Sequence, residues 1–327
     1  METLLDVKGL RTYYHTGTRV VPAADDVSFT VRKGEVVGLV GESGCGKSTV
    51  ARSLVGLIDK GYTRIESGEV LYRGRDLTRA SKKELCEIRG NRISMIFQDP
   101  FVSLSPVYTV REQIFEVMKA HDPKLRRRDA EGAILDLMRK VGIPSPELRL
   151  NDYPYQLSGG MQQRIMIAIA LACNPDILIA DEPTTALDVT VQAQVLDLLC
   201  RLKDEYQMSI ILISHNLGVI ASMCDRILVM YGGVVVEEGP SAEIFKHPRH
   251  PYTRGLLASI PSITEEREEL YSIRGTVPTF SAPVTQCRFA GRCDYAMEQC
   301  LRAEPRLREL GNGCKVRCCL TGEEAQE

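Results

Sequence analysis

Residues 36–48 read VVGLVGESGCGKS, an apolar run followed by a glycine-rich loop. The run is typical of a short buried strand, and Gly41 to Ser48 match the spacing G-x-x-x-x-G-K-S in full. Glycines there let backbone N–H groups converge on phosphate oxygens, and a following helix points its positive end at them. The sequence therefore predicts a strand, a phosphate-binding loop and a helix from Lys47 to about Ile58.

The side chains of this loop have separate expected roles. Lys47 should reach the β- and γ-phosphates, and the Ser48 hydroxyl should bind Mg²⁺. The alternative is a glycine-rich turn without a ligand, which is disfavoured because the loop stands between a strand and a helix. The residues expected to contact nucleotide here are Gly41, Ser43, Gly44, Cys45, Gly46, Lys47, Ser48 and Thr49.

Further buried strands are predicted at Ile177–Ala180, Ile210–Ile213 and Ile227–Met230. Between the first two, apolar residues from Val191 to Leu202 recur at helical spacing and predict an amphipathic crossover helix. Because strands and helices alternate in this way, we expect an α/β core with a mostly parallel sheet.

Two other regions differ from that core. Apolar and polar residues alternate near Leu4–Val7, Val27–Val31 and Glu69–Tyr72, which predicts a smaller antiparallel sheet. From about residue 100 to residue 158 the pattern is helical and polar.

Two carboxylates, Asp181 and Glu182, end the strand predicted at Ile177–Ala180. Adjacent carboxylates can divide the work, so that Asp181 holds Mg²⁺ and Glu182 orients and polarises an attacking water. Alone, such a pair before Pro183 would more often be a surface turn, and its place after an apolar strand favours catalysis. His215 also follows a strand, where a lone histidine is more often structural.

Residues 157–164 read LSGGMQQR and open an apolar helix. Ser158 can cap this helix, while Gly159 and Gly160 leave backbone N–H groups accessible. By themselves these residues predict only a helix start.

Together, the loop ending in Lys47, the LSGG stretch, the Asp181–Glu182 pair and His215 resemble the ATP-binding subunit of an ABC transporter. The resemblance covers the whole chain and implies ATP and Mg²⁺ as ligands. It implies a P-loop NTPase (RecA-like) core, a small antiparallel β subdomain, a helical signature subdomain and a Cys-rich C-terminal extension. It assigns hydrolysis to Glu182, with Lys47, Gln98 and the switch histidine His215, which contacts the γ-phosphate.

The same resemblance assigns the residues that bind Mg²⁺ and the residue that stacks on the adenine base. Gln98 lies in a Phe-Gln-Asp-Pro stretch that matches the family's Q-loop, so that Ser48, Gln98 and Asp181 would hold Mg²⁺. Tyr14 takes the position of an aromatic residue that stacks on adenine, and its neighbour Tyr13 remains an alternative.

Three residues are implied to serve a second subunit. Ser158 and Gly160 would act in trans, donating to the γ-phosphate that an opposing subunit holds. Asp188, in Ala-Leu-Asp, resembles the D-loop that crosses to the partner. The resemblance thus implies a protein that works as half of a pair.

Three stretches, residues 88–100, 188–192 and 247–253, are similar to the oligopeptide/dipeptide/nickel importer ATPases, and the Arg-Gly-x-x-Ile run in the first resembles the D-type subunit. This implies a peripheral ATPase at the cytoplasmic face of the inner or plasma membrane. Its partners would be a second, F-type ATPase, two permease subunits and, indirectly, an extracytoplasmic solute-binding protein. Peptides are the expected cargo, with nickel and glutathione importers as alternatives. Ser105 and Asn216 replace the family's usual Asn and Asp.

Composition shifts near the C-terminus. We expect an ATPase domain over residues 1–238, with its helical part at about 100–165, and an extension over 239–327. Six of the eleven cysteines lie between Cys287 and Cys319. In a reducing compartment a terminal cluster of this kind more often binds metal than forms disulfides.

The extension resembles that of the same importers, in which four cysteines can hold a [4Fe–4S] cluster. Cys287, Cys293 and Cys300 would be three of the ligands, and Cys318 aligns better as the fourth than Cys314 or Cys319. Tetrahedral zinc and a cluster without metal are the alternatives, although the tight C-x₂₋₄-C pairs that zinc favours are missing from these three.

Charge and hydropathy exclude some functions. A net charge of −2 offers no electrostatic case for nucleic acid as a partner. No apolar run approaches the ~18 residues of a membrane helix, and the first residues lack the basic start and apolar core of a signal peptide. We therefore expect the chain to stay in the cytosol.

Three rival functions remain. A non-transport ABC ATPase in DNA repair or translation is opposed by the single signature and the short segment before it. A regulatory module without hydrolysis is opposed by the presence of Lys47, Asp181, Glu182 and His215. An exporter ATPase is the nearer rival, and the likeness of the extension to importers opposes it.

Overall fold

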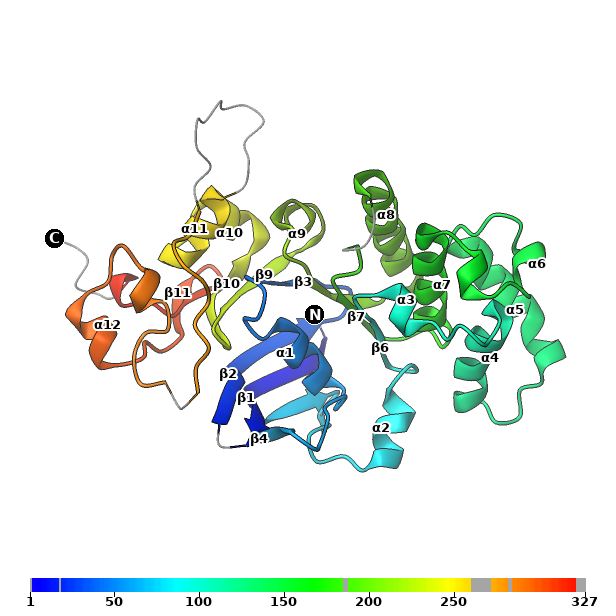
Figure 1. Ribbon diagram of the computed structural model, residues 1–327, viewed down its shortest axis with the longest axis horizontal. Helices are drawn as coiled ribbons and strands as arrows, with labels where there is room; N and C mark the ends of the chain where they lie inside the picture. Colours follow the sequence, from blue (N-terminus) through cyan, green and yellow to red (C-terminus); the bar gives the residue numbers. More distant parts are fainter. Residues whose placement is uncertain (1, 18, 185–187, 260–271, 282–283, 322–327) are drawn as a thin grey trace. The chain divides into compact units, whose positions relative to one another are not determined.

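The computed structural model describes residues 2–17, 19–184, 188–259, 272–281 and 284–321. The chain divides into two compact units. The first comprises residues 1–4, 32–35 and 79–212, and the second comprises residues 5–31, 36–78 and 213–327. Figure 1 labels the elements of both units.

The first unit contains parallel strands and the helices between residues 79 and 212. Strands β6 and β7 pair in parallel from Ile93↔Ile177 to Ile96↔Ala180, and β8 lies next to β7. Every residue of β7 and β8 is buried, as in sheets covered on both faces. The elements are α2 (Lys82–Ile88), β6 (Ile93–Ile96), α3 (Pro100–Ser103), α4 (Val110–His121), α5 (Arg127–Lys140), α6 (Pro146–Arg149), η1 (Pro154–Gln156), α7 (Gly159–Leu171), β7 (Ile177–Asp181), α8 (Val189–Tyr206) and β8 (Ser209–Ile213).

Local signals explain where several of these helices begin. Helices α2 and α4 each start with a capping box, Ser81 with Glu84 and Thr109 with Glu112, in which each side chain accepts from the other residue's backbone N–H. The amphipathic helix expected around Val191–Leu202 is confirmed as α8, whose apolar residues Val195, Leu198, Leu199 and Leu202 are buried. The helical character expected between residues 100 and 158 is confirmed by α3 to α6.

The second unit contains the antiparallel sheet, the phosphate loop and the C-terminal region. Its elements are β1 (Thr3–Thr16), β2 (Arg19–Arg32), β3 (Val36–Val40), α1 (Lys47–Leu54), β4 (Thr63–Tyr72), β5 (Arg75–Asp76), α9 (Leu217–Met223), β9 (Arg226–Tyr231), β10 (Val234–Pro240), α10 (Ser241–Lys246), α11 (Pro251–Ala258), η2 (Ala290–Arg292), α12 (Glu298–Arg302), β11 (Arg308–Gly311), β12 (Cys314–Val316) and η3 (Cys319–Thr321).

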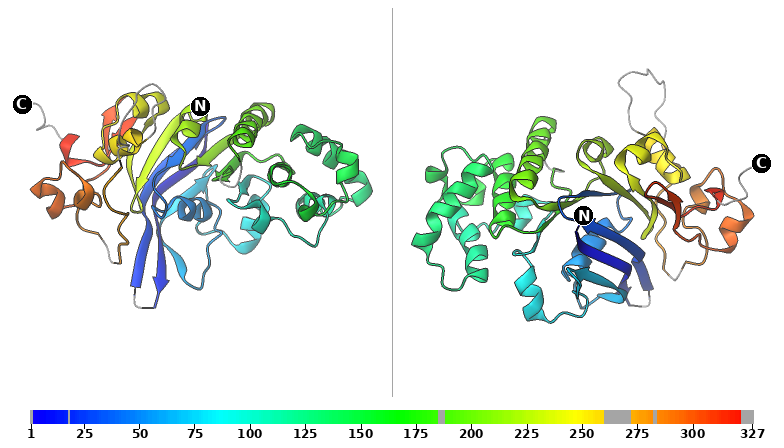
Figure 2. Two further views of the ribbon diagram at one scale, coloured as in Figure 1. Left: turned by 45° about the horizontal axis from the view of Figure 1, so that its top comes forward. Right: turned by 180° about the vertical axis from the view of Figure 1, so that it is seen from behind.

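The smaller antiparallel sheet has the strand order β2-β1-β4-β5, and β1 and β2 run side by side as long strands (Figure 2). Strand β4 pairs with β1 from Leu5↔Tyr72 to Tyr14↔Thr63. In β2, Val27, Phe29 and Val31 are buried and alternate with more exposed residues. This period of two is what a sheet with one covered face requires, and it confirms the antiparallel sheet expected from the sequence.

The parallel part of this unit continues into strands from the C-terminal region. Strand β3 pairs in parallel with β9, and β9 turns through Gly232 and Gly233 into the antiparallel β10. Strand β12 then pairs with β10 at Glu237↔Val316, and β11 pairs with β12. The sequence did not reveal β11 and β12, because strands of three or four residues carry too little alternation. The division at residue 238 falls inside β10 and stays a prediction.

Helix α1 is shorter than expected, ending at Leu54 rather than near Ile58. Gly56 adopts a φ of 64°, and the N–H groups of Gly56 and Leu57 donate to the carbonyls of Ser53 and Arg52. This is a Schellman cap, which ends a helix because the left-handed glycine reverses the chain. Within the described ranges, every helix is too short or too polar to span a bilayer.

Candidate nucleotide site

The phosphate loop follows β3 and ends where α1 begins, in the second unit. Gly41 and Gly46 have φ values of 151° and 104°. A Cβ atom would lie 2.3 Å from the Met230 carbonyl oxygen at Gly41 and 1.9 Å from the Ala23 carbonyl oxygen at Gly46. Both positions therefore require glycine. Gly46 also gives α1 no side-chain cap, as at helix starts that bind anions.

Lys47 is turned into its own loop. Its ammonium donates to the carbonyl oxygens of Gly41 at 2.8 Å and Glu42 at 3.0 Å, and its side chain is buried. Cys45 is buried beside it, and burial raises the pKa of the Cys45 thiol. The loop thus surrounds one positive charge with backbone oxygens that a phosphate group can replace as its partners.

The two candidate adenine residues have different surroundings. The Tyr13 hydroxyl donates to Asp25 at 2.8 Å, and burial together with this bond raises the pKa of Tyr13 to about 12. The Tyr14 hydroxyl lies 3.0 Å from the Thr49 hydroxyl. The Tyr14 ring stacks on the Tyr62 ring, with 6.0 Å between the ring centres. Tyr14, Thr49 and Tyr62 line a cavity of about 210 Å³. Tyr14 is therefore the tyrosine that lies against the helix following the phosphate loop.

His215 is exposed and follows β8, just before α9. Its neighbour Asn216 caps α9, because the Asn216 side-chain oxygen accepts from the N–H groups of Gly218 at 3.0 Å and Val219 at 3.4 Å. Asparagine and aspartate cap helices about equally well. The departure from the family's Asp thus keeps the local structure that presents His215.

The carboxylates and the Q-loop glutamine belong to the first unit. Asp181 is the last residue of β7 and is buried, and Glu182 follows with a φ of 48°. A non-glycine residue in this region carries backbone strain, which is common at active sites. Gln98 Nε2 donates to Glu182 Oε2 at 3.0 Å. Because β6 and β7 are parallel neighbours, the residues after them emerge at the same edge of the sheet.

The signature stretch forms the start of α7. Ser158 is exposed, and its hydroxyl accepts from the Met161 N–H at 3.4 Å. A Cβ atom on Gly160 would lie 3.1 Å from Val191, so that glycine there lets α7 approach α8 closely. Gln162 donates from Nε2 to the carbonyls of Pro154 and Leu157 and thereby shapes the turn before the helix.

Asp188 is the N-cap of α8, and its carboxylate accepts from the Val191 N–H at 2.9 Å. Residues 185–187, which include the rest of the expected D-loop, lie outside the described residues. Gln192 donates to the Thr184 carbonyl at 3.0 Å and holds the chain after Glu182. The sequence did not single out Gln162 or Gln192 as supports, because side-chain amides that bind backbone carbonyls have no spacing signal.

The C-terminal cysteines Cys287 to Cys319 form no disulfide bonds. The pKa of Cys287 is raised to about 11, chiefly by burial, and Cys300 and Cys318 contribute to this rise. Cys300 also raises the pKa of Cys293 and Cys318, after burial. The four cysteines proposed as ligands are therefore neighbours. Across the ranges that the structure describes, no three His, Cys, Asp or Glu side chains are grouped closely enough to hold a single metal ion.

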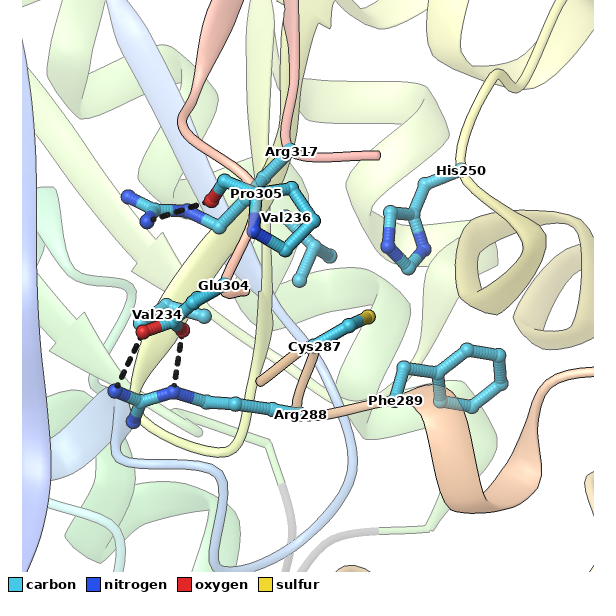
Figure 3. Close-up of a pocket in the computed structure, with 9 residues that line it drawn as sticks. All are labelled: Val234, Val236, His250, Cys287, Arg288, Phe289, Glu304, Pro305 and Arg317. Atoms are coloured by element: carbon cyan, nitrogen blue, oxygen red, sulfur yellow. Dashed lines mark hydrogen bonds and ion pairs between the residues drawn. The ribbon is translucent and has the colours of Figure 1, made fainter. Parts of the chain in front are cut away.

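Of these cysteines, Cys287 lines a small pocket together with Arg288 and Glu304 (Figure 3). In it, Arg288 Nε donates to Glu304 at 2.7 Å, and Arg288 Nη1 donates to the Gly232 carbonyl at 2.6 Å. Burial alone would raise the pKa of Asp25, but hydrogen bonds from Arg288 and Tyr13 hold it below its usual value. The side chain of Arg288 is 1% exposed, so this network belongs to the interior of the second unit.

Comparison with known proteins agrees with this geometry. Residues 24–185 match the family described as ABC transporter, and residues 236–300 match the C-terminal region of oligopeptide/dipeptide transporters. The chain is 47% identical, over 100% of its length and 99% of the relative's, to the oligopeptide transport ATP-binding protein AppD of Bacillus subtilis. It is 46% identical, over 96% of its length and 94% of the relative's, to the dipeptide transport ATP-binding protein DppD of Haemophilus influenzae.

Solved structures give the same result. A bacterial ABC transporter cassette, solved as a dimer, matches with a TM-score of 0.65 and 28% identity, over 72% of this chain and 98% of that chain. The dimer of the same cassette bound to ADP and Pi, in a post-hydrolysis state, matches with a TM-score of 0.63 and 29% identity. The expected fold class, an α/β P-loop core of the ABC type, is confirmed. The chain belongs to the ABC transporter ATP-binding proteins, in the oligopeptide/dipeptide branch of that family.

Proposed function

We propose that this chain hydrolyses ATP to power the import of peptides by a multi-subunit ABC transporter. The phosphate loop around Lys47 supports nucleotide binding, and the Gln98–Glu182 pair supports hydrolysis. The full-length likeness to oligopeptide and dipeptide transport ATP-binding proteins supports the class of cargo.

Binding begins at the phosphate loop. Lys47 would exchange the carbonyls of Gly41 and Glu42 for phosphate oxygens, while the backbone N–H groups at the start of α1 would donate hydrogen bonds to other phosphate oxygens. Bound Mg²⁺ would neutralise the phosphates, held by Ser48, Gln98 and Asp181. These residue types offer the oxygen ligands that magnesium requires.

Hydrolysis would rest on Glu182. Its carboxylate is the base that polarises the attacking water. Gln98 fixes this carboxylate, because its Nε2 donates a hydrogen bond to Glu182 Oε2 at 3.0 Å. His215 would contact the γ-phosphate and add positive or hydrogen-bonding stabilisation as charge develops there. The Gln98–Glu182 hydrogen bond is the single observation on which this mechanism depends.

The test replaces the base. Glu182→Gln should leave nucleotide binding intact and lower ATP turnover of the assembled complex by roughly 10²- to 10⁴-fold. The matched control is Glu205→Gln, which removes an exposed carboxylate paired with Lys140 at 2.8 Å. Steady-state phosphate release and titration with a non-hydrolysable ATP analogue give the two readouts. Normal turnover in the Glu182 variant would exclude this residue as the base.

The remaining roles concern other subunits. Ser158 and Gly160 would donate to the γ-phosphate held by a second, F-type ATPase, Asp188 would contact the same partner, and Tyr14 would stack on adenine. The exposed position of Ser158 at a helix start supports a contact in trans. The complex would include two permeases and, indirectly, a solute-binding protein, and the chain would lie on the cytoplasmic face of the membrane.

Copurification tests this assembly. An affinity tag on the chain should recover one similar ATPase and two integral membrane proteins from detergent-solubilised membranes. Recovery of a homodimer without membrane proteins would contradict the proposed composition.

We also propose that Cys287, Cys293, Cys300 and Cys318 hold a [4Fe–4S] cluster. The influence of Cys300 on the other three thiols supports a common site, and four thiolates are the usual ligand set of such a cluster. Cys314 is influenced by Glu237 and Glu243 instead, which disfavours it as the fourth ligand. A cluster there would supply structural stability to a region with little apolar core.

Anaerobic purification tests the cluster. Brown protein with stoichiometric iron and sulfide is expected, and Cys318→Ser should lose both while Cys314→Ser keeps them. Colourless protein that contains zinc would exclude iron–sulfur ligation.

A further inference from the structure

The C-terminal region contacts the phosphate loop at Glu42. Arg292 Nη1 donates to Glu42 Oε2 at 2.7 Å, and Arg292 Nη2 donates to Glu42 Oε1 at 3.0 Å. The Glu42 backbone N–H donates to the Tyr252 hydroxyl at 2.9 Å. Both the side chain and the backbone of this loop residue are thus fixed by residues more than 200 positions away in the sequence.

Glu42 is also bonded to the phosphate-binding lysine. Its carbonyl oxygen accepts from Lys47 Nζ at 3.0 Å. A short path therefore leads from Arg292 through Glu42 to the ammonium group that would contact phosphate. Each step is a direct hydrogen bond within the second unit.

Arg292 is itself held rigidly. Its side chain is 7% exposed, and its Nε donates to the Arg274 carbonyl at 2.7 Å. Nη2 donates to the Gly275 carbonyl at 3.1 Å, and the guanidinium lies 5.7 Å from the centre of the Tyr231 ring. A planar guanidinium fixed on several sides presents its fork to a carboxylate with little loss of side-chain entropy.

We infer that Arg292 is a positioning residue of the nucleotide site, which acts through Glu42 and makes ATP affinity depend on the C-terminal region. This inference rests on the proposed binding of ATP by the phosphate loop.

The charge of Glu42 explains why Arg292 would raise the affinity for ATP. The Glu42 carboxylate stands inside a loop that would hold a triphosphate, and an unpaired carboxylate there would repel the ligand. The bidentate pair with Arg292 offsets this negative charge and fixes the loop at the same time. Neither effect requires Arg292 to touch the nucleotide.

The experiment compares affinities for ATPγS with Mg²⁺, measured by calorimetry on the full chain. Arg292→Ala should raise the Kd roughly tenfold. In the assembled complex it should raise the KM for ATP and leave kcat unchanged, because the reacting groups are untouched. Arg302→Ala is the control, since Arg302 forms an exposed ion pair with Glu298 in the same region, and its Kd should equal that of the wild type.

A double-mutant cycle tests the route through Glu42. In a Glu42→Gln background, Arg292→Ala should change the Kd by less than about twofold, because the charge that Arg292 offsets is gone. An equal loss of affinity in both backgrounds would overturn the inference, and so would an unchanged Kd in the single variant. If thermal unfolding shows that Arg292→Ala does not fold, Arg292→Gln replaces it in the cycle. Wild-type protein that binds no ATPγS would overturn the proposed function and this inference with it.

Discussion

The phosphate loop and the signature loop each lead into a helix, and the two helices differ in whether a side chain caps the first turn. Helix α1 follows Gly46, which has a left-handed φ and offers no side-chain cap. Helix α7 follows Ser158, whose hydroxyl accepts from the Met161 N–H. Lys47 is buried in its own loop, whereas Ser158 is exposed.

This difference separates a loop that binds a ligand within its own chain from one suited to a ligand held elsewhere. An uncapped helix start keeps its N–H groups for phosphate, and the surrounding residues must then hold the loop by other means. Glu42, Tyr252 and Arg292 do this for the phosphate loop. The signature loop is held by its own cap and by Gln162, both of which lie within a few residues of it.

The largest effect is expected from removing the charge at the centre of the phosphate loop. Lys47→Ala should weaken binding of ATPγS about 100-fold, because charge-assisted hydrogen bonds to phosphate are lost. Lys8→Ala is the control, since Lys8 forms an exposed ion pair with Asp6 in the same unit. Calorimetric titration measures both. If the Kd for ATPγS rose no more in the Lys47 variant than in the Lys8 variant, the phosphate loop would not be the loop that binds nucleotide within its own chain.

Low pH should destabilise the helix that carries Tyr252, the residue whose hydroxyl binds the Glu42 backbone in the phosphate loop. His250 Nδ1 accepts from the Tyr252 N–H at 3.0 Å, so it caps the helix that carries Tyr252. The pKa of His250 is lowered to about 3, chiefly by burial. Arg254 contributes to this lowering, and a hydrogen bond with the Arg317 backbone partly offsets it. Glu237 also faces it, by accepting from the His250 backbone N–H.

The sign follows from proton binding. The unfolded histidine has a pKa of ~6.5, so between pH 3 and ~6.5 the unfolded chain binds more protons and stability falls as pH falls. The free energy of unfolding should be about 2 kcal/mol lower at pH 5 than at pH 7.5 from this residue. Urea unfolding at both pH values measures it. His250→Asn, which keeps a capping side chain, should remove that part of the pH dependence, and the exposed His247→Gln should retain it.

A smaller effect is expected at the signature loop. Ser158→Ala should leave the Kd of the isolated chain for ATPγS unchanged and lower ATP turnover of the assembled complex roughly tenfold, since one hydrogen bond to a partner's nucleotide is lost. Loss of the cap should also cost about 1 kcal/mol of stability. Weaker ATPγS binding by the isolated chain would show that the two loops do not differ as described.

The smallest effect is expected at a third helix start, before α9. Asn216→Asp should change the free energy of unfolding by less than about 0.5 kcal/mol, because both side chains cap a helix. Asn216→Ala should cost about 1 kcal/mol, which chemical denaturation can resolve. Equal stability of the Asp and Ala variants would mean that the cap contributes nothing.

Features with a local cause were predictable from the sequence. The caps at Ser158 and Asp188 depend on residues within a few positions of one another. Gln98 and Glu182 could be located one by one, but their contact follows from the parallel pairing of β6 and β7. The end of α1 was misplaced because apolar periodicity continues beyond Leu54, while Gly56 turns the chain.

The sequence by itself determined the family, the phosphate loop and the residues of the signature, because each is a short pattern with a defined backbone conformation. Only the tertiary structure decided that Arg292 and Tyr252 hold Glu42 and that β12 joins β10. Such contacts join segments far apart in the chain, and the spacing of residues carries no record of which distant segments meet. The physical reason is that hydrogen bonds and ion pairs depend on distance in space, which folding alone sets.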